Sequence, residues 1–305
     1  MRWSTNSGPG AHRQNLETKF KRWILKLATR DKRFRRLGLS HIFSQHVAGG
    51  VLCLVPFKDH KVFVDPRDDR IAYTLLSGEE WERESFEAAI SISANKRAFS
   101  PDSVFVDIGA NIGLLTIYAM LSGRFARAVA IEPDAWNRSI LQQNLEINGL
   151  SDVVTVLDKA VSSQKGSMTF HRDQMNLGAH SLEPGFTTSP GETDVIEVDT
   201  LDNLLSHISI PPDIIGFVKI DVEGHELSVL EGMPRVLASS PSLMVEATFD
   251  ARDSAGRSGV MDQLRRLIGD HYSACCELGD PNKRNLRALS SFQPNAIQHE
   301  LLITR

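Results

Sequence analysis

Cysteine is scarce in this sequence, which contains only Cys53, Cys275 and Cys276. A small, odd number of cysteines with one adjacent pair is typical of reduced thiols and not of a disulfide framework. Their spacing also lacks the two pairs of ligands that a structural zinc site needs. We therefore expect a cytoplasmic protein without disulfide bonds and without a zinc site.

Long apolar runs and an overall excess of basic residues are also missing. No apolar segment reaches the roughly 20 residues that a membrane-spanning helix requires. The first ten residues are polar and include glycine and proline, so they do not have the pattern of a secretory signal. The formal net charge of the 305 residues is −4, which argues against a chain built mainly for binding nucleic acid.

One segment departs from this acidic balance. Between Lys19 and Arg36 the chain carries nine lysines and arginines against one aspartate, a net charge of about +8. The apolar residues Phe20, Trp23 and Leu27 recur there at helical spacing. We predict a basic amphipathic helix, with two readings open: it contacts an anionic surface, or it is a solvated helix lying on the rest of the protein.

The stretch from Val104 to Gly113 is the most informative part of the sequence. An apolar strand over 104–107 ends in Asp107, a tight turn with Gly109 and Asn111 follows, and an apolar helix over 112–121 comes next. This order builds a nucleotide pocket at the carboxyl end of a parallel strand. The glycines do not fit the Gly-x-Gly-x-x-Gly spacing of dinucleotide sites, and Asp107 would repel a pyrophosphate. A positively charged nucleoside without phosphates, S-adenosylmethionine, fits better; an ordinary strand-to-helix turn is the alternative.

The second and third predicted strands carry further cofactor candidates. The strand 128–131 ends in Glu132, 25 residues after Asp107, where a carboxylate can accept both ribose hydroxyl hydrogens. After the strand 153–157, Asp158 or the backbone near Ala160 can meet the adenine edge, although a surface turn explains Asp158 equally well.

Strands and helices alternate along the chain, which predicts an α/β protein with a mostly parallel, doubly wound sheet and helices on both faces. Further strands are expected over 215–221, 242–246, 272–276 and 299–304, and further helices over 135–147, 201–208, 230–237 and 259–268. Ahead of this core we expect a β-hairpin formed by 51–57 and 61–64, another strand over 71–76, and a helix that runs to about residue 96. Strands over 166–170 and 194–198 flank a long polar loop, 173–193, and loops of that length usually carry function.

Candidate catalytic residues cluster where the strand 215–221 ends. Lys219 lies within an apolar strand, where an ammonium group is costly unless it is paired, and the nearest partners in sequence are Asp221 and Glu223. His225 follows, and an imidazole can take a proton from a hydroxyl acceptor. The two carboxylates are the alternative bases, and His225 as a helix-start residue without a proton role is equally open. We expect no metal ion, although such a cluster is able to bind one.

Four segments together resemble the FkbM-type methyltransferases, in the same order and at similar spacing: VFVDIGANIG, AIEPDAWNRSILQQNLEINGL, VTVLDKAVSSQKGSMTF and FVKIDVEGHELSVLEG. The resemblance covers roughly residues 81–246. It implies a class I (Rossmann-like) methyltransferase domain over 81–305 that uses S-adenosylmethionine, preceded by an extension over 1–80 with the basic helix and the hairpin. A similar aromatic-Glu motif implies a place for Glu82 near the cofactor, although a solvated acidic residue at a helix start explains Glu82 equally well. A similar Asn…Gly…Ser-Leu pattern implies roles for Asn176 and Ser181 in the long loop; His180 fits that pattern less well.

The resemblance also implies the acceptor class. It favours O-methylation of a hydroxyl on a sugar, polysaccharide, glycolipid or other secondary metabolite, so the partner is a small molecule or a glycan. Methylation of RNA or of another nitrogen acceptor is the alternative that the basic segment suggests, but nucleic acid is the less favoured partner. A non-catalytic nucleotide-binding protein is the remaining alternative.

Overall fold

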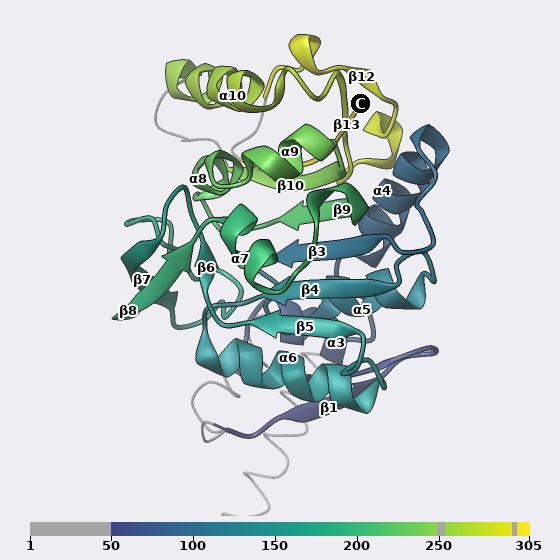
Figure 1. Ribbon diagram of the computed structural model, residues 1–305. Helices are drawn as coiled ribbons and strands as arrows, with labels where there is room; N and C mark the ends of the chain where they lie inside the picture. The colour runs from purple at the N-terminus through teal and green to yellow at the C-terminus, as the bar shows by residue number, and fades with distance from the viewer. Residues whose placement is uncertain (1–49, 249–253, 295–297) are drawn as a thin grey trace, which may run out of the picture.

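The structure of the protein is a computed structural model, and it describes residues 50–248, 254–294 and 298–305. The predicted basic helix lies outside these residues. The core is one eight-stranded sheet with the strand order β12-β11-β13-β10-β9-β3-β4-β5 (Figure 1). Its parallel strands are β3 (Val104–Ile108), β4 (Arg127–Ile131), β5 (Val154–Leu157), β9 (Ile215–Ile220) and β10 (Ser242–Thr248). Its antiparallel strands are β13 (Gln298–Thr304), β11 (Ala274–Glu277) and β12 (Arg287–Ala288). This mixed sheet confirms the predicted class I fold.

Helices cover both faces of the sheet because the apolar side chains of its strands alternate. Val104 and Val106 of β3 pack into one core cluster, and Phe105 packs into the other. The first cluster contains residues of α7 (Leu201–His207), α8 (Glu226–Glu231), α9 (Pro234–Ser239) and α10 (Ser254–Ile268). The second contains residues of α3 (Ile71–Leu76), α4 (Arg83–Lys96), α5 (Leu114–Leu121) and α6 (Ala135–Ile147). Within the described part of the chain, no helix has both the length and the apolar character to cross a bilayer.

A separate three-stranded sheet lies beside the carboxyl ends of the parallel strands (Figure 1). It has the order β6-β8-β7, with β6 (Ala160–Val161), β7 (Gly166–Asp173) and β8 (Pro190–Asp199). β7 and β8 are the two strands predicted around the long loop, and they pair antiparallel. Three short 3-10 turns complete the described elements: η1 (Pro212–Ile214), η2 (Pro281–Lys283) and η3 (Leu289–Ser291).

The predicted hairpin is confirmed as β1 (Cys53–Pro56) paired antiparallel with β2 (Lys61–Val64). It is joined to α6 through Asn144, whose side chain accepts from the Phe63 N–H (2.6 Å) and donates to the Phe63 carbonyl (3.1 Å). Valines of β2 belong to the same core cluster as α4, α5 and α6. This part of the predicted extension therefore shares a core with helices of the region predicted to follow it.

The strand predicted over 71–76 is wrong, because these residues form helix α3. Asp68 accepts hydrogen bonds from the backbone N–H groups of Arg70 (2.8 Å) and Ala72 (3.3 Å), which satisfies donors at the start of the helix. Ile71, Ala72 and Leu75 are buried, and this spacing matches one face of a helix. Six residues are too few for their period to be read with certainty from the sequence.

Candidate active site

A hollow with about 850 Å³ of empty space, part of it open to solvent, lies at the carboxyl ends of β3, β4 and β9. We call it the first hollow. Residues that follow these strands line it, including Gly109, Glu132 and Asp221, together with Ala160 of β6. The carboxyl ends of parallel strands are where α/β sheets bind nucleotides. The sequence-predicted cofactor residues Gly109, Asn111, Glu132, Ala160 and Glu82 all line this hollow.

The turn after β3 depends on glycine. Gly109 has a φ of 76°, and a Cβ at this position would lie 1.9 Å from the carbonyl oxygen of Asp221. Only glycine therefore allows the ends of β3 and β9 to approach this closely. Asn111, with a φ of 50°, donates its backbone N–H to Glu132. Gly113 is the N-cap residue of α5 and lies close to the Leu141 side chain. It is not among the residues that line the first hollow.

Glu132 is buried and fits the predicted ribose contact. Its Oε2 accepts from the Asn111 N–H and its Oε1 from the Asp134 N–H, both at 2.8 Å. Burial raises the pKa of the Glu132 carboxyl to about 7, although these backbone donors oppose the shift. Each carboxylate oxygen has a second lone pair, so Glu132 can also accept hydrogen bonds from two ribose hydroxyls.

Asp107 lies behind the lining and not in it. Its side chain is fully buried; Thr116 Oγ1 donates to one oxygen (2.6 Å) and Lys219 Nζ lies 3.4 Å from the other. Lys219 Nζ also donates to the Gly109 carbonyl (2.7 Å) and lies 3.3 Å from Asp221. Asp107 therefore acts on the hollow through Lys219 in this arrangement, and a direct contact with the cofactor stays a prediction.

The pairing of Lys219 with Asp221 was expected from the sequence, but its pairing with Asp107 was missed. These two residues are direct neighbours in the register between β3 and β9. Burial alone would lower the pKa of the Lys219 ammonium, but the carboxylates of Asp221 and Asp107 raise it above its usual value. The sequence did contain a signal for this ion pair. Each of the two apolar strands carries one charged residue near its end, and the two charges are opposite in sign.

A second hollow, with about 610 Å³ of empty space, adjoins the first. It shares Glu82, Lys219 and Asp221 with the first hollow, and Glu246 and Glu300 complete its polar lining. Glu246 of β10 and Glu300 of β13 are cross-strand partners. Burial, and then the charge of Asp221, raises the carboxyl pKa of Glu82 to about 8 and that of Glu246 well above its usual value. For Glu300 burial is again the largest cause, and its pKa rises to about 7. Glu300 was missed, although a carboxylate within an apolar closing strand was a usable signal.

Besides Asp107 and Gly113, three further candidates do not line either hollow. Asp158 is exposed on the surface after β5. His225 is buried, and both of its ring nitrogens have partners: Nδ1 lies 2.7 Å from Glu183 Oε1, and Nε2 lies 3.0 Å from Ser162 Oγ. Glu223 lies in the turn after β9, and burial raises its pKa to about 8. The catalytic roles of His225 and Glu223 therefore stay predictions, with Asp221 and Lys219 as the candidates that do reach the hollows.

The long loop covers part of the first hollow with Leu177, Gly178, His180 and Leu182. Asn176 Oδ1 accepts from the Gly178 N–H (3.1 Å) and so shapes the covering turn. Ser181 Oγ donates to the Glu223 carbonyl (2.6 Å), which joins the loop to the turn after β9. His180, the less favoured candidate in the loop, lines the hollow; its Nδ1 accepts from the Asp173 N–H (3.0 Å).

Asp221, Glu223 and Glu246 each place a carboxylate oxygen within 4.8 Å of the others, a spacing that a divalent cation could use. Lys219 already supplies a positive charge at Asp221. The expectation that the reaction needs no metal ion stays a prediction.

The chain is similar to several known proteins. Residues 107–276 match the methyltransferase FkbM domain. Over 155 residues the chain is 30% identical to hexuronic acid methyltransferase AglP of Haloferax volcanii, which covers 50% of this chain and 59% of that protein. Over 252 residues it is 26% identical to AMB antimetabolite synthetase AmbE of Pseudomonas aeruginosa, which covers 68% of this chain and 11% of that protein.

Solved methyltransferase structures are also similar. Methyltransferase FkbM from Methylobacillus flagellatus is 19% identical with a TM-score of 0.41, over 89% of this chain and 59% of that one. TYW2 from M. jannaschii in complex with AdoMet is 10% identical with a TM-score of 0.43, over 84% of this chain and 85% of that one.

The chain thus spans less than two thirds of the length of AglP and about a tenth of AmbE. The domain match includes more than half of the residues and contains both the glycine turn after β3 and the Asp-Val-Glu-Gly turn after β9. The chain therefore belongs to the FkbM family of S-adenosylmethionine-dependent methyltransferases.

Proposed function

We propose that this protein transfers a methyl group from S-adenosylmethionine to a hydroxyl oxygen of a neutral sugar, glycan or related secondary metabolite. The observation that carries the proposal is the pair of adjoining hollows, which share Glu82, Lys219 and Asp221. One hollow suits a nucleoside and the other is lined by carboxyl groups. A donor and an acceptor bound in the two would meet at the three shared residues.

The residues of the first hollow fit the cofactor. Glu132 has lone pairs left for the ribose hydroxyls, and Gly109 leaves its backbone bare for close approach. Asp221, at the junction, provides negative charge for a ligand that carries an ammonium and a sulfonium. When bound, the cofactor supplies a methyl group on a sulfur that leaves as a neutral thioether. The chain's own task is then to orient the acceptor, exclude water and remove one proton.

The lining of the second hollow supports a hydroxyl acceptor. Its four carboxyl groups can each accept a hydrogen bond from a hydroxyl, and those that are protonated can also donate one. The name of AglP, a hexuronic acid methyltransferase, supports a saccharide acceptor, but a hexuronate is an anion. Among the described residues, Lys219 is the one cation that lines this hollow, and it is already paired with Asp107 and Asp221. We therefore favour a neutral acceptor.

The same charges disfavour RNA. A phosphate in the second hollow would meet carboxyl groups and a lysine that is already paired with two carboxylates, whereas specific nucleic-acid sites are strongly positive. The basic segment 19–36, which motivated the RNA alternative, lies outside the described residues, so its contact with an anionic surface stays a prediction. A cytoplasmic location also stays a prediction; the free thiols of Cys53, Cys275 and Cys276 agree with it.

The test is a transfer assay with methyl-labelled cofactor and three sets of acceptors: neutral oligosaccharides, uronic-acid oligosaccharides and RNA. We expect label in the neutral set, and much less of it for Glu132→Ala when the cofactor concentration is below saturation. Calorimetry should show cofactor binding by the unmodified protein. Absence of cofactor binding would overturn the proposal, and salt-sensitive labelling of RNA alone would replace it with the RNA alternative.

A further inference from the structure

Glu82 lies where the two hollows meet. It lines both, a property it shares with only Lys219 and Asp221 among the described residues. It caps the start of α4 with a φ of 54°, a left-handed conformation that is uncommon outside glycine. Its carboxyl group therefore has a place between donor and acceptor, and its backbone is held in a conformation of higher energy.

Of the three shared residues, Glu82 is the best suited to accept a proton. Lys219 is an ammonium group without a lone pair, and its positive charge is stabilised by two carboxylates. Asp221 has an oxygen engaged by Lys219 at 3.3 Å. Glu82 forms no ion pair within the described chain, and the neighbouring Trp81 side chain lowers the pKa of its carboxyl less than burial raises it.

The environment of Glu82 matches the task of a base at neutral pH. Burial, followed by the negative charges of Asp221 and Glu300, raises the pKa of its carboxyl to about 8. A base is most effective when its pKa lies near the working pH.

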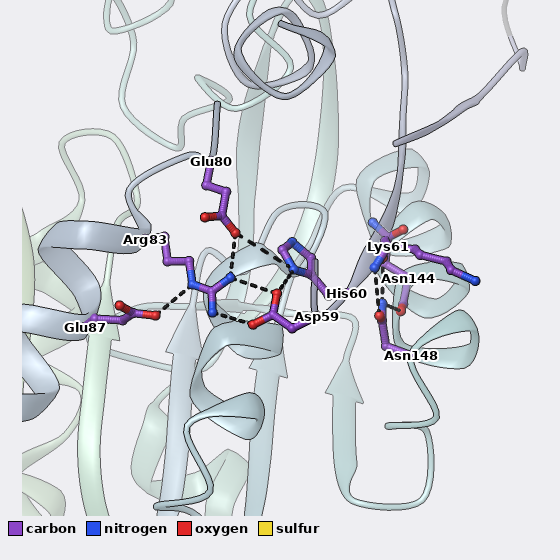
Figure 2. A network of polar contacts seen from close by, with 8 residues as sticks. All are labelled: Asp59, His60, Lys61, Glu80, Arg83, Glu87, Asn144 and Asn148. Carbon is purple, nitrogen blue, oxygen red and sulfur yellow. Dashed lines mark hydrogen bonds and ion pairs between the residues drawn. The ribbon is translucent and has the colours of Figure 1, made fainter. Parts of the chain in front are cut away.

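A network of ion pairs fixes the backbone on either side of Glu82 (Figure 2). The next residue, Arg83, contacts Asp59 through two bonds (2.5 and 2.9 Å), Glu80 (2.5 Å) and Glu87 (2.7 Å). Asp59 lies in the turn of the β1–β2 hairpin, where His60 Nδ1 is 2.8 Å from it. The guanidinium also lies 5.2 Å above the Tyr118 ring. Arg83 is therefore tied to the hairpin, to α4 and to α5 at once.

We propose that Glu82 is the catalytic base of the methyl transfer and that Arg83, through Asp59 and Glu80, is the positioning residue that holds it between the hollows. The acceptor O–H bond breaks and its proton goes to a Glu82 oxygen. The freed oxygen pair forms the bond to the methyl carbon, and the pair of the broken carbon–sulfur bond stays on sulfur. The Glu82 proton is then released to solvent. This assignment rests on the proposed function.

The first test is Glu82→Gln, which keeps the size and the hydrogen bonding of the side chain but cannot accept the proton. We expect the transfer rate to fall by about 10²- to 10⁴-fold, with the cofactor dissociation constant from calorimetry changed less than about threefold. The rise of the rate with pH up to about 8 should disappear. Glu84→Gln is the matched control, because Glu84 is exposed on the same helix and pairs with Arg284; its rate should stay within about twofold.

A second measurement does not depend on turnover. In the cofactor-free protein, carbon-13 NMR of labelled glutamate should show a carboxyl titrating near pH 8 that is missing in Glu82→Gln. Arg83→Gln should move this titration and the pH dependence of the rate together, while cofactor affinity is kept. A purely structural role of Arg83 would lower stability without moving either.

The outcomes separate the two proposals. If the unmodified protein transfers methyl and Glu82→Gln keeps both its rate and its pH dependence, the base assignment is overturned and the proposed function stands. If the unmodified protein neither binds the cofactor nor transfers methyl, the proposed function fails, and the base assignment fails with it whatever the NMR titration shows.

Discussion

Replacing Lys219 by methionine should destabilise the protein strongly, although methionine is apolar and of similar length. The variant loses a buried ammonium whose Nζ lies 3.4 Å from Asp107 and 3.3 Å from Asp221, and donates at 2.7 Å to the Gly109 carbonyl. At an effective dielectric constant of about 20, each ion pair contributes about 5 kcal/mol of Coulomb energy. The cost of removing the ammonium from water offsets much of this, so we expect a net loss of about 3–5 kcal/mol.

The assay is urea unfolding at pH 8, with a double-mutant cycle. Asp107→Asn removes the fully buried carboxylate that Lys219→Met leaves without its cation. The loss of unfolding free energy in the double variant should therefore be smaller than the sum of the two single losses by at least about 1 kcal/mol. Strictly additive losses, or a loss below about 1 kcal/mol for Lys219→Met alone, would refute the reasoning.

Lys159→Met is the matched control for the charge. Its Nζ is closer to a carboxylate, 2.8 Å from Glu197, but the two side chains are 29% and 71% exposed, against 7% and 0% for Lys219 and Asp107. Water screens this pair, so removing it should cost far less than removing Lys219. Equal losses in the two variants would mean that burial is not the cause.

Four further predictions follow from the site. Glu132→Ala should weaken cofactor binding about 10- to 100-fold by calorimetry, since it removes charged hydrogen bonds to the ribose. Gly109→Ala should unfold at a clearly lower temperature than Gly123→Ala, because both have positive φ but only Gly109 has a carbonyl 1.9 Å from the added Cβ. His225→Asn should lose about 1–3 kcal/mol of stability yet keep the pH dependence of the rate. Burial raises the carboxyl pKa from the usual 4.5 to about 8 at Glu82 and about 7 at Glu132. The folded state therefore binds more protons, and the free energy of unfolding should decrease as pH rises from about 5 to 8.

Each of these has an opposite result that counts against it. Unchanged cofactor affinity in Glu132→Ala would remove the ribose contact. Equal melting temperatures for the two glycine variants would mean that the strand ends are able to separate. A lost pH dependence in His225→Asn would restore His225 as the base. A free energy of unfolding that rises between pH 5 and 8 would mean that these carboxyls are ionised in the folded state.

The sequence by itself determined the alternating strands and helices of the sheet and their order, although it predicted α3 as a strand. Periodic apolar residues set the bounds of α6, which are the predicted ones, and the apolar run before Asp107 set β3. These features are local, because the spacing of apolar residues follows from the helix or strand that they form. The glycine turn and Glu132 were found for the same reason, since a strand end and the residue after it are adjacent in the chain.

Tertiary structure alone decided which charged residues of different strands meet. Asp107 reaches Lys219, and Glu246 reaches Glu300, only because the register of neighbouring strands places them side by side. In the same way, His225 faces partners from two distant segments and does not face the hollows. A local pattern gives the type of each strand but not its neighbours or their register, because these depend on how the whole sheet packs.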